Sequence, residues 1–483
     1  MSMICFGQQA QVEKQIDIVL TNNLTKEKVI SMGKFGFVIQ SQQKIGQRGM
    51  KTSKYLRYNT DLEFVSEKEL SLESHLNLKD FIVEDSILYL AFTHNGGGIF
   101  TIAKYDVLKD EIKEFTGEFP KGTQVKDFKI LNGLFYFVCS VSEKYNMTIV
   151  NLERQEITIQ SLNFEDILPR VRSISNFQVM ENTDELTLSV DFRESAREIK
   201  THFVILNEKA EITSHYDLTQ SEGKYIMSSN AIKTGDKSYI ITGDYSLSES
   251  LIVSNGLFIT VINAGNIEKS NFYNFTELKN FFTSVSERFQ TRIEQRKERA
   301  AENGREYSVS YLAITHDISK IDEDYFFLIE LYYPLMAISS STTSTMSTAS
   351  QNGLQYTHAY LMRFDKEANI VWDQSIRMDY TLSSNYAKKI MNVSKTSQGN
   401  YCLVFNDVDG LKSKTIDKNG NTIEELSSVI NETTEGRKNT TDADESLNYW
   451  YDSYFLQSGY FMKNINENER ILRRVFSVNK IRL

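Results

Sequence analysis

Cysteine and proline are scarce in this chain, and no apolar run is long enough to cross a membrane as a helix. Three cysteines and three prolines occur in 483 residues, and three cysteines cannot form a disulfide framework. The longest apolar stretch, residues 325–338, is shorter than a membrane-spanning helix and contains Glu330 and Pro334. We therefore expect no transmembrane segment and no disulfide-based fold.

Basic charge is also in short supply. The formal net charge is −10 and the isoelectric point is near 5.4, whereas general nucleic-acid binders usually carry a basic footprint. The excess of acidic residues makes copies of the chain repel one another. The composition therefore predicts a protein that does not bind nucleic acid and that is monomeric.

Motifs for catalysis and for cofactor or metal binding are missing. Residues 95–98 (NGGG) lack the Lys-Ser/Thr of a phosphate-binding loop, and residues 417–421 lack the downstream glutamate of a calcium loop. The six histidines are too scattered for the local spacing of a zinc site: His75, His94, His202, His215, His316 and His358. The sequence predicts no catalytic residue, no cofactor and no metal site, and it leaves open whether the protein is an enzyme.

Phenylalanine and tyrosine, by contrast, are abundant and recur in a pattern. The 29 Phe and 25 Tyr residues favour strands. Residues 78–83 (LKDFIV), 125–130 (VKDFKI) and 174–179 (ISNFQV) resemble one another, and residues 228–232 are a weaker copy. A tight polar turn and a strongly apolar strand follow each copy, which indicates an internal repeat.

A second recurring segment closes each repeat. Residues 364–372 align with residues 416–424, and residues 207–213 and 151–158 are looser copies. Each predicts a hairpin, because a strand, a polar turn and an alternating strand follow one another. The full repeat is therefore four antiparallel strands, A to D, with tight A–B and C–D turns and a variable B–C loop, as in one propeller blade.

Seven such repeats can be delimited, and the two ends of the chain supply an eighth. The last segment, residues 447–483, holds about three strands, and residues 15–20 form a strand without a blade of its own. Pairing them would cover two exposed sheet edges and give eight blades, whereas seven remain if the first and last segments share one. The complete repeats cover residues 25–74, 75–118, 124–163, 174–218, 225–275, 307–378 and 386–427.

This architecture resembles the β-propellers of exported bacterial proteins over nearly the whole chain, residues 11–483. The WD dipeptide and the double glycine of kelch repeats are absent, so the resemblance implies no named family and no functional residue. We expect an all-β fold, a single β-propeller of four-stranded antiparallel blades with one helical insertion.

Two insertions interrupt the repeat. Residues 274–304 predict a helix, since Asn274 and Glu277 form a capping box and residues 303–304 (NG) supply a stop. An apolar stripe at helical spacing supports this prediction: Leu278, Phe281, Phe282, Val285, Phe289 and Ile293. Residues 339–353 are rich in Ser and Thr and predict a flexible loop.

Four polar residues occupy equivalent places in strand A of successive repeats: Asp80, Asp127, Asn176 and Asn230. If strand A lines a central channel, these side chains could ring it and bind a cation or a polar ligand. The alternative, which we favour, is that they bond locally to the backbone at strand ends.

The long connections predict where a partner binds. In each repeat the B–C and D–A connections lie at one end of the blade, and loops on a rigid scaffold gather binding residues. We expect this side, including Arg288, Arg292, Arg296 and Phe289 of the predicted helix, to bind a protein or a glycan. The function predicted is an exported binding or scaffold protein. The alternatives are a polysaccharide lyase or hydrolase with its site at the channel mouth, and a cytosolic interaction scaffold.

The N-terminus predicts export. Residues 1–7 form a short apolar run that is followed by residues 8–11 (QQAQ), which resembles the end of a secretory signal peptide within residues 1–10. A basic region and most of an apolar core are missing, so a cytoplasmic protein with a frayed N-terminus is the alternative. Export would place the mature protein in the periplasm, at the cell surface or outside the cell.

Overall fold

The computed structural model resolves the repeats into antiparallel sheets. They number eight, and each has four strand positions, so the all-β fold with eight four-stranded β-propeller blades is confirmed. The strands group into two compact units, residues Met1–Gln124 with Ile390–Leu483 and residues Val125–Lys389. The structure describes residues 11–20, 26–45, 49–94, 97–168, 170–180, 183–195, 198–219, 223–339, 348–384, 386–396, 398–407, 410–428, 438–439, 446–464 and 472–482.

Three blades of the first unit follow the order of the chain. A 3-10 helix, η1 (Gly33–Phe35), lies between β2 and β3. The strands are β2 (Lys26–Ser31), β3 (Phe37–Ile45), β4 (Met50–Tyr58) and β5 (Phe64–Glu73); β6 (Leu76–Glu84), β7 (Ile87–His94), β8 (Ile99–Asp106) and β9 (Glu111–Glu118); and β27 (Asn392–Lys395), β28 (Tyr401–Asp407), β29 (Gly410–Ile416) and β30 (Thr422–Ser428).

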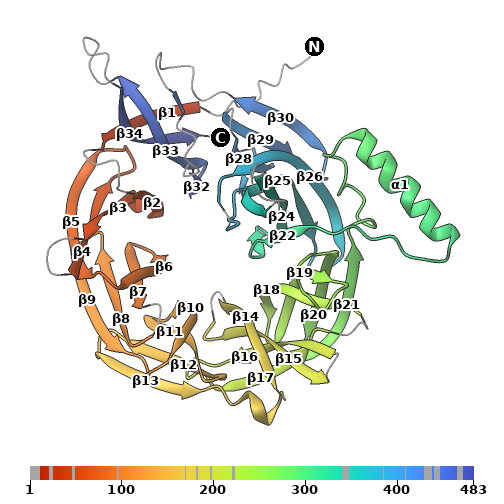
Figure 1. Cartoon of the computed structure of the whole chain (residues 1–483), viewed down its shortest axis with the longest axis horizontal. Helices are drawn as coiled ribbons and strands as arrows, with labels where there is room; N and C mark the ends of the chain where they lie inside the picture. Colours follow the sequence, from red (N-terminus) through yellow and green to blue (C-terminus); the bar gives the residue numbers. More distant parts are fainter. Residues whose placement is uncertain are drawn as a thin grey trace. The chain divides into compact units, whose positions relative to one another are not determined.

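The fourth blade of this unit joins the two ends of the chain. β1 (Gln11–Val19) pairs antiparallel with β34 (Leu472–Arg482), and Figure 1 shows β1 in red beside β34 in blue. β34 pairs with β33 (Tyr454–Asn464), beside which β31 (Lys438–Asn439) and β32 (Ser446–Tyr451) share the first position. The predicted pairing of the N-terminal strand with the last blade is thus confirmed.

The second unit holds the other four blades. Blades are numbered in chain order from the one that starts with β2, so these are the third to the sixth. In the sixth blade, β22 and β23 share the first position beside β24. The strands are β10 (Gln124–Leu131), β11 (Leu134–Val141), β12 (Lys144–Asn151) and β13 (Glu156–Ser161); β14 (Val171–Val179), β15 (Leu186–Ser195), β16 (Glu198–Leu206) and β17 (Ile212–Asp217); β18 (Tyr225–Gly235), β19 (Ser238–Ser246), β20 (Gly256–Asn263) and β21 (Asn266–Asn274); and β22 (Leu312–Thr315), β23 (Ser319–Ile321), β24 (Asp324–Ser339), β25 (Thr348–Phe364) and β26 (Ile370–Leu382). A 3-10 helix, η3 (Phe164–Asp166), precedes β14.

The recurring C–D hairpins owe their shape to one polar side chain. Asp417 Oδ1 accepts hydrogen bonds from the backbone N–H groups of Asn419 and Asn421, each at 2.8 Å. This bonding holds the turn closed and places Gly420 at a φ of 86°. Ala368 takes the same left-handed place in the preceding blade, at a φ of 57°. The turn needs a side-chain acceptor at its first position, which explains why that position is Asp or Asn in the recurring segments.

The inserted helix is shorter than the sequence predicts. α1 covers Glu287–Glu302, whereas residues 275–286 form successive turns. The prediction of a helix over 274–304 is wrong for its first half because tertiary bonds take the backbone groups: the N–H of Asn280 donates to Asp373 Oδ2 at 2.8 Å and that of Ser284 to Ser375 Oγ at 3.2 Å. The predicted stop holds, because Gly304 has a φ of 64° and its N–H bonds to the carbonyl of Ala301.

The Ser/Thr-rich segment is partly strand. β24 and β25 pair as far as Ser339 opposite Thr348, so residues 348–353 belong to a strand rather than to the flexible loop predicted over 339–353. Residues 340–347, the remainder of that prediction, lie outside the described residues.

Long connections gather at one end of the fifth and sixth blades. Because neighbouring strands are antiparallel, the B–C and D–A connections of a blade lie at the same end of its sheet. Here they are residues 247–255, between β19 and β20, and residues 275–311, between β21 and β22. The C–D turns at the other end are residues 264–265 and 365–369. The third blade, by contrast, has a B–C connection of only residues 142–143.

Deleting residues 1–22 should destabilise the protein. The deletion removes β1, exposes the edge of β34, and takes Ile16 and Ile18 from a core that contains Phe476 and Val478. We expect the melting temperature to fall by about 5 °C or more, since a few kcal/mol of apolar burial are lost. Differential scanning calorimetry against a chain lacking only residues 1–10 checks this. Equal melting curves for the two deletions would contradict it.

Candidate functional site

Asp80 and Asp127 bond locally to the backbone. Asp80 Oδ1 accepts the N–H of Phe81 at 2.8 Å, and Asp127 Oδ1 accepts the N–H of Phe128 at 2.7 Å. Asp127 also lies 3.6 Å from Lys129 Nζ. These contacts are of the kind that the favoured structural interpretation predicts. That these residues line a channel stays a prediction.

Asn176 and Asn230 link the first strands of three neighbouring sheets. Asn176 Nδ2 donates to the carbonyl of Ser229 on β18. Asn230 is buried, and its Nδ2 donates to Thr315 Oγ1 on β22 at 3.4 Å. Both amides therefore join blades within the second unit, and their polar atoms are used in structural contacts.

The predicted partner-binding residues lie on α1, which is mostly surrounded by solvent. Arg288, Arg292 and Arg296 are exposed, and Phe289 is 38% exposed. Ile293 is the buried residue of this helix. α1 thus has the accessibility that a partner surface needs, although the contact with a partner stays a prediction.

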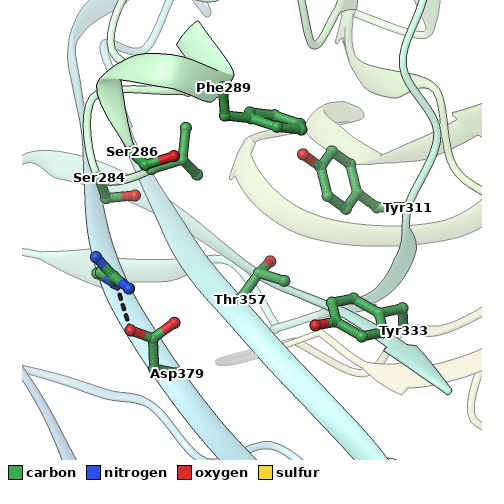
Figure 2. A pocket seen from close by; sticks show the side chains of 9 residues that line it. Ser284, Ser286, Phe289, Tyr311, Tyr333, Thr357 and Asp379 are labelled. Carbon is green, nitrogen blue, oxygen red and sulfur yellow. Dashed lines mark hydrogen bonds and ion pairs between the residues drawn. The ribbon is translucent and has the colours of Figure 1, made fainter. Parts of the chain in front are cut away.

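A cavity of about 350 Å³ opens where α1 begins. It lies at the end of the sixth blade that carries the long connections, between the start of α1 and strands β24, β25 and β26. Figure 2 shows aromatic rings on one side and a charged pair on the other. The lining residues are Ser284, Val285, Ser286, Phe289, Tyr311, Tyr333, Thr357, Arg377 and Asp379.

An interruption of the strand ladder shapes the floor of the cavity. Tyr356 pairs with Tyr380 and His358 with Arg377, so Thr357 faces two residues of β26 across a bulge. One of these, Asp379, has a φ of 50°, a conformation that costs energy for a residue with a side chain. Bulges occur next to binding sites, and this one lies beside Arg377 and Asp379, which line the cavity.

Asp373 fixes the wall formed by the segment that precedes α1. Its carboxylate, buried on β26, accepts the backbone N–H of Asn280 at 2.8 Å, the Asn280 side-chain amide at 3.1 Å and the Tyr360 hydroxyl at 2.8 Å. Three donors on one buried carboxylate offset much of its desolvation. The contacts hold residues 275–286 against β26 and so position Ser284 and Val285 at the cavity.

Tyr311 is held rigidly in the opposite wall. Its backbone exchanges two hydrogen bonds with Ser254, at 2.7 and 2.9 Å, and burial raises the pKa of its hydroxyl to about 12. Behind it, the His358 ring packs edge-on against Tyr311 and Phe281, with centroids 5.6 and 5.0 Å apart. Burial lowers the pKa of His358 to about 3, so this imidazole is neutral at physiological pH.

Polar groups without an internal partner lie at this site. Among the described residues, neither Ser284 Oγ nor His358 Nε2 makes a hydrogen bond, and both atoms are buried. Such a group costs about 1–3 kcal/mol when it is left unsatisfied. Arg377 and Asp379 are in direct contact, with side chains 62% and 51% exposed. The arrangement thus combines an aromatic wall with donors and acceptors that a ligand can use.

Sequence reasoning found Phe289 and missed Tyr311, Tyr333, Arg377 and Asp379. The missed residues belong to strands or strand ends, where Tyr, Arg and Asp at alternating positions look like ordinary solvent-facing side chains. A signal did exist in the length of the connection before β22, because an insertion of that length has to pack somewhere. The sequence did not show that this connection packs against β26, the fourth strand of the sixth blade.

Two histidines on adjacent strands lie close together. His202 Nδ1 and His215 Nδ1 are 3.1 Å apart and their ring centroids are 5.3 Å apart, so the two nitrogens face each other as donor and acceptor. Burial, together with the neighbouring His215, lowers the pKa of His202 to about 4. In the part of the chain that the structure describes, no group of three or more His, Cys, Asp or Glu residues could hold a metal.

Comparison with known proteins gives a likeness of fold only. No protein-family model and no curated protein matches the chain. A polysaccharide lyase, Uly1, is 9% identical, with 84% of this chain and 90% of that chain covered at a TM-score of 0.39. An oligogalacturonate lyase in complex with manganese is 8% identical, with 97% of each chain covered at a TM-score of 0.39. A functionally unknown protein from Desulfotomaculum acetoxidans DSM 771 is 8% identical, with 78% of this chain and 93% of that chain covered at a TM-score of 0.37. Values this low carry no argument about what this chain does.

Within the described residues, no helix is long and apolar enough to span a membrane.

Three buried carboxylates form a second group of polar side chains, inside the sheets. Asp191, Asp244 and Glu330 lie in the second strands of the fourth, fifth and sixth blades and are almost completely buried. Ser228 donates to Asp244 and also lies 2.8 Å from Thr315 Oγ1. Asp191 and Asp244 accept hydrogen bonds from hydroxyl groups of neighbouring strands, and Glu330 lies 2.6 Å from His316 Nε2 on the same blade, which indicates a structural role for all three.

Replacing Asp244 by Asn should stabilise the protein at neutral and higher pH. Burial raises the pKa of Asp244 from 3.8 to about 6, against smaller opposing hydrogen bonds. The folded state therefore holds a proton that the unfolded state has lost, so stability from this group is present below about pH 4 and disappears as the pH rises to about 6. Asp244→Asn removes this loss, and urea unfolding at pH 8 should show a gain of up to about 3 kcal/mol.

The gain should shrink towards pH 4, where the wild-type carboxyl is protonated in both states. Asp236→Asn, a change at an exposed residue of the β18–β19 turn, serves as the control. An Asp244→Asn protein less stable than wild type at pH 8 would show that the charged carboxylate is needed.

Proposed function

We propose that this chain is a binding protein that takes a carbohydrate in the sixth-blade cavity. The observation that carries the proposal is the arrangement of Phe289, Tyr311 and Tyr333 opposite Arg377 and Asp379 (Figure 2). The volume of about 350 Å³ is at the lower end of the range for small-molecule sites, about 300–1,000 Å³. The cavity lies at the end of the blade that carries the long connections, and loops on a rigid scaffold commonly hold binding residues.

The two sides of the cavity fit the two kinds of surface that a sugar ring presents. A pyranose has apolar C–H faces, which pack on aromatic rings, and a rim of hydroxyl groups, which both donate and accept hydrogen bonds. Tyr333 and Phe289 are 48% and 38% exposed, so their rings are available to a ligand. Arg377 supplies donors, Asp379 supplies acceptors, and the hydroxyl of Ser286 can do either.

The lining favours binding over hydrolysis. Glycoside hydrolases use a pair of carboxyl groups on opposite sides of the scissile bond. Asp379 is the one carboxylate among the described residues that line this cavity, and Arg377 already contacts it. Export of the chain stays a prediction, because residues 1–10 lie outside the described residues.

Removing an aromatic ring from the cavity should weaken sugar binding. Saturation-transfer NMR with neutral and acidic oligosaccharides at millimolar concentration should detect ligands of the wild-type protein. Tyr333→Ala and Phe289→Ala should each reduce affinity about tenfold, as expected when a buried aromatic contact is lost.

Tyr449→Ala is the matched control, since Tyr449 is 46% exposed, lies on β32 and is not one of the residues that line the cavity. Its affinity should equal that of the wild type. Absence of saturation transfer from every sugar class, or transfer that survives both cavity substitutions unchanged, would refute the proposal.

A further inference from the structure

Four arginines form a continuous strip along the solvent side of α1. Arg288, Arg292, Arg296 and Arg299 follow one another at spacings of four, four and three residues, which places them on one side of an α-helix. We call this set the arginine strip. Its length is about 16 Å at the rise of an α-helix, and all four residues are exposed.

No acidic partner of the arginine strip is found in the part of the chain that the structure describes. Among the described residues, no carboxylate lies within ion-pair distance of any of the four arginines. The contact made by Arg296 is a 3.4 Å hydrogen bond from Nη1 to the Tyr307 hydroxyl. Like charges four residues apart destabilise a helix, so intrahelical stability does not explain this spacing.

Most acidic residues of α1 lie on a different side. Glu287, Glu294 and Glu298 have no arginine of the strip three or four residues away, whereas Glu302 follows Arg299 by three. Charges interleaved as Glu–Arg pairs at this spacing would stabilise α1, yet three of its four glutamates are not placed to form them. In a chain with a net charge of −10, a strip of four unneutralised arginines is a local reversal of sign.

The arginine strip starts at the cavity. Phe289 lines the cavity, and Arg292 and Arg296 follow it at three and seven residues, so both lie near its side of the helix. Ser286, the N-cap of α1, also lines the cavity and makes no capping bond with its side chain. The positive end of the helix dipole therefore lies at the same place.

We infer that the ligand is an acidic oligosaccharide, with one sugar unit in the cavity and its charged neighbours along the arginine strip. This inference rests on the proposed function. Carboxylate or sulfate groups on successive sugars are the chemistry that recognises such a strip, because arginine pairs with planar anions through two parallel N–H donors. An acidic peptide would meet the same charges, and the test separates the two.

Isothermal titration of the full chain with matched polysaccharides tests the inference. The probes are oligomers from several uronate polymers, each compared with its carboxyl-reduced form, in which the same backbone is neutral. The acidic forms should bind about tenfold more tightly at low salt, and the difference should disappear at high salt. A poly-glutamate peptide is the comparison probe.

The test variant combines three substitutions, Arg288→Gln, Arg292→Gln and Arg296→Gln. Its affinity for the acidic oligomers should be about tenfold lower than that of the wild type, and its affinity for the neutral forms should be unchanged. Its melting temperature should equal that of the wild type, because the three side chains are exposed. Glu294→Gln with Glu298→Gln is the matched control, and it should not weaken binding.

The outcomes distinguish failure of the acidic-ligand inference from failure of the proposed sugar binding. Equal binding of acidic and neutral sugars, unaffected by the arginine substitutions, would overturn the inference and leave the proposed function standing. Binding of poly-glutamate alone would replace the sugar by an acidic peptide and overturn both. Absence of any sugar binding would contradict the proposed function itself.

Discussion

The buried carboxylate of Asp373 fixes where the long β21–β22 connection crosses the sixth blade. It sits on the fourth strand of that blade and accepts three hydrogen bonds, two of them from Asn280. Fourth strands of propeller blades usually present an open edge. Here residues 275–286 cover part of that edge, and Phe281 is buried against Phe275 and Tyr360, with ring centroids 4.4 and 5.1 Å apart. This attachment holds residues 280–284 against β26 immediately before α1 begins, and Ser284 lines the cavity.

The rest of the site depends on departures from regular strand pairing. Thr357 interrupts the ladder on both sides, against β24 and against β26, and Asp379 adopts a left-handed backbone conformation beside it. A regular sheet would direct successive side chains to alternate faces. Arg377 and Asp379, two residues apart on β26, both line the cavity beside this bulge, while the neutral, buried His358 packs against the wall formed by Tyr311. The strained Asp379 and the unsatisfied hydroxyl of Ser284 both line the cavity where the ligand is proposed to bind.

Much of the fold could be predicted because its signals are local. The first residues of the C–D turns, such as Asp417, mark each hairpin through bonds within five residues, and the terminal pairing of β1 with β34 follows from an unpartnered strand at each end of the chain. The helix start could not be predicted. The capping box does form, with the N–H of Asn274 donating to Glu277 Oε2 at 2.8 Å, but bonds to residues about ninety positions later override it. The cavity residues were missed for the same reason, since β24, β25 and β26 bring them together only in the folded blade.

Hydrogen exchange of Asp373→Ala, read by mass spectrometry peptide by peptide, tests most directly whether this carboxylate holds the connection in place. Loss of the acceptor frees the N–H of Asn280 and leaves the buried Tyr360 hydroxyl without its partner, so local opening should require less free energy. The account predicts much faster exchange across residues 278–290 and unchanged exchange in β2 to β5 of the other unit. Exchange across residues 278–290 that stays at the wild-type rate would contradict it.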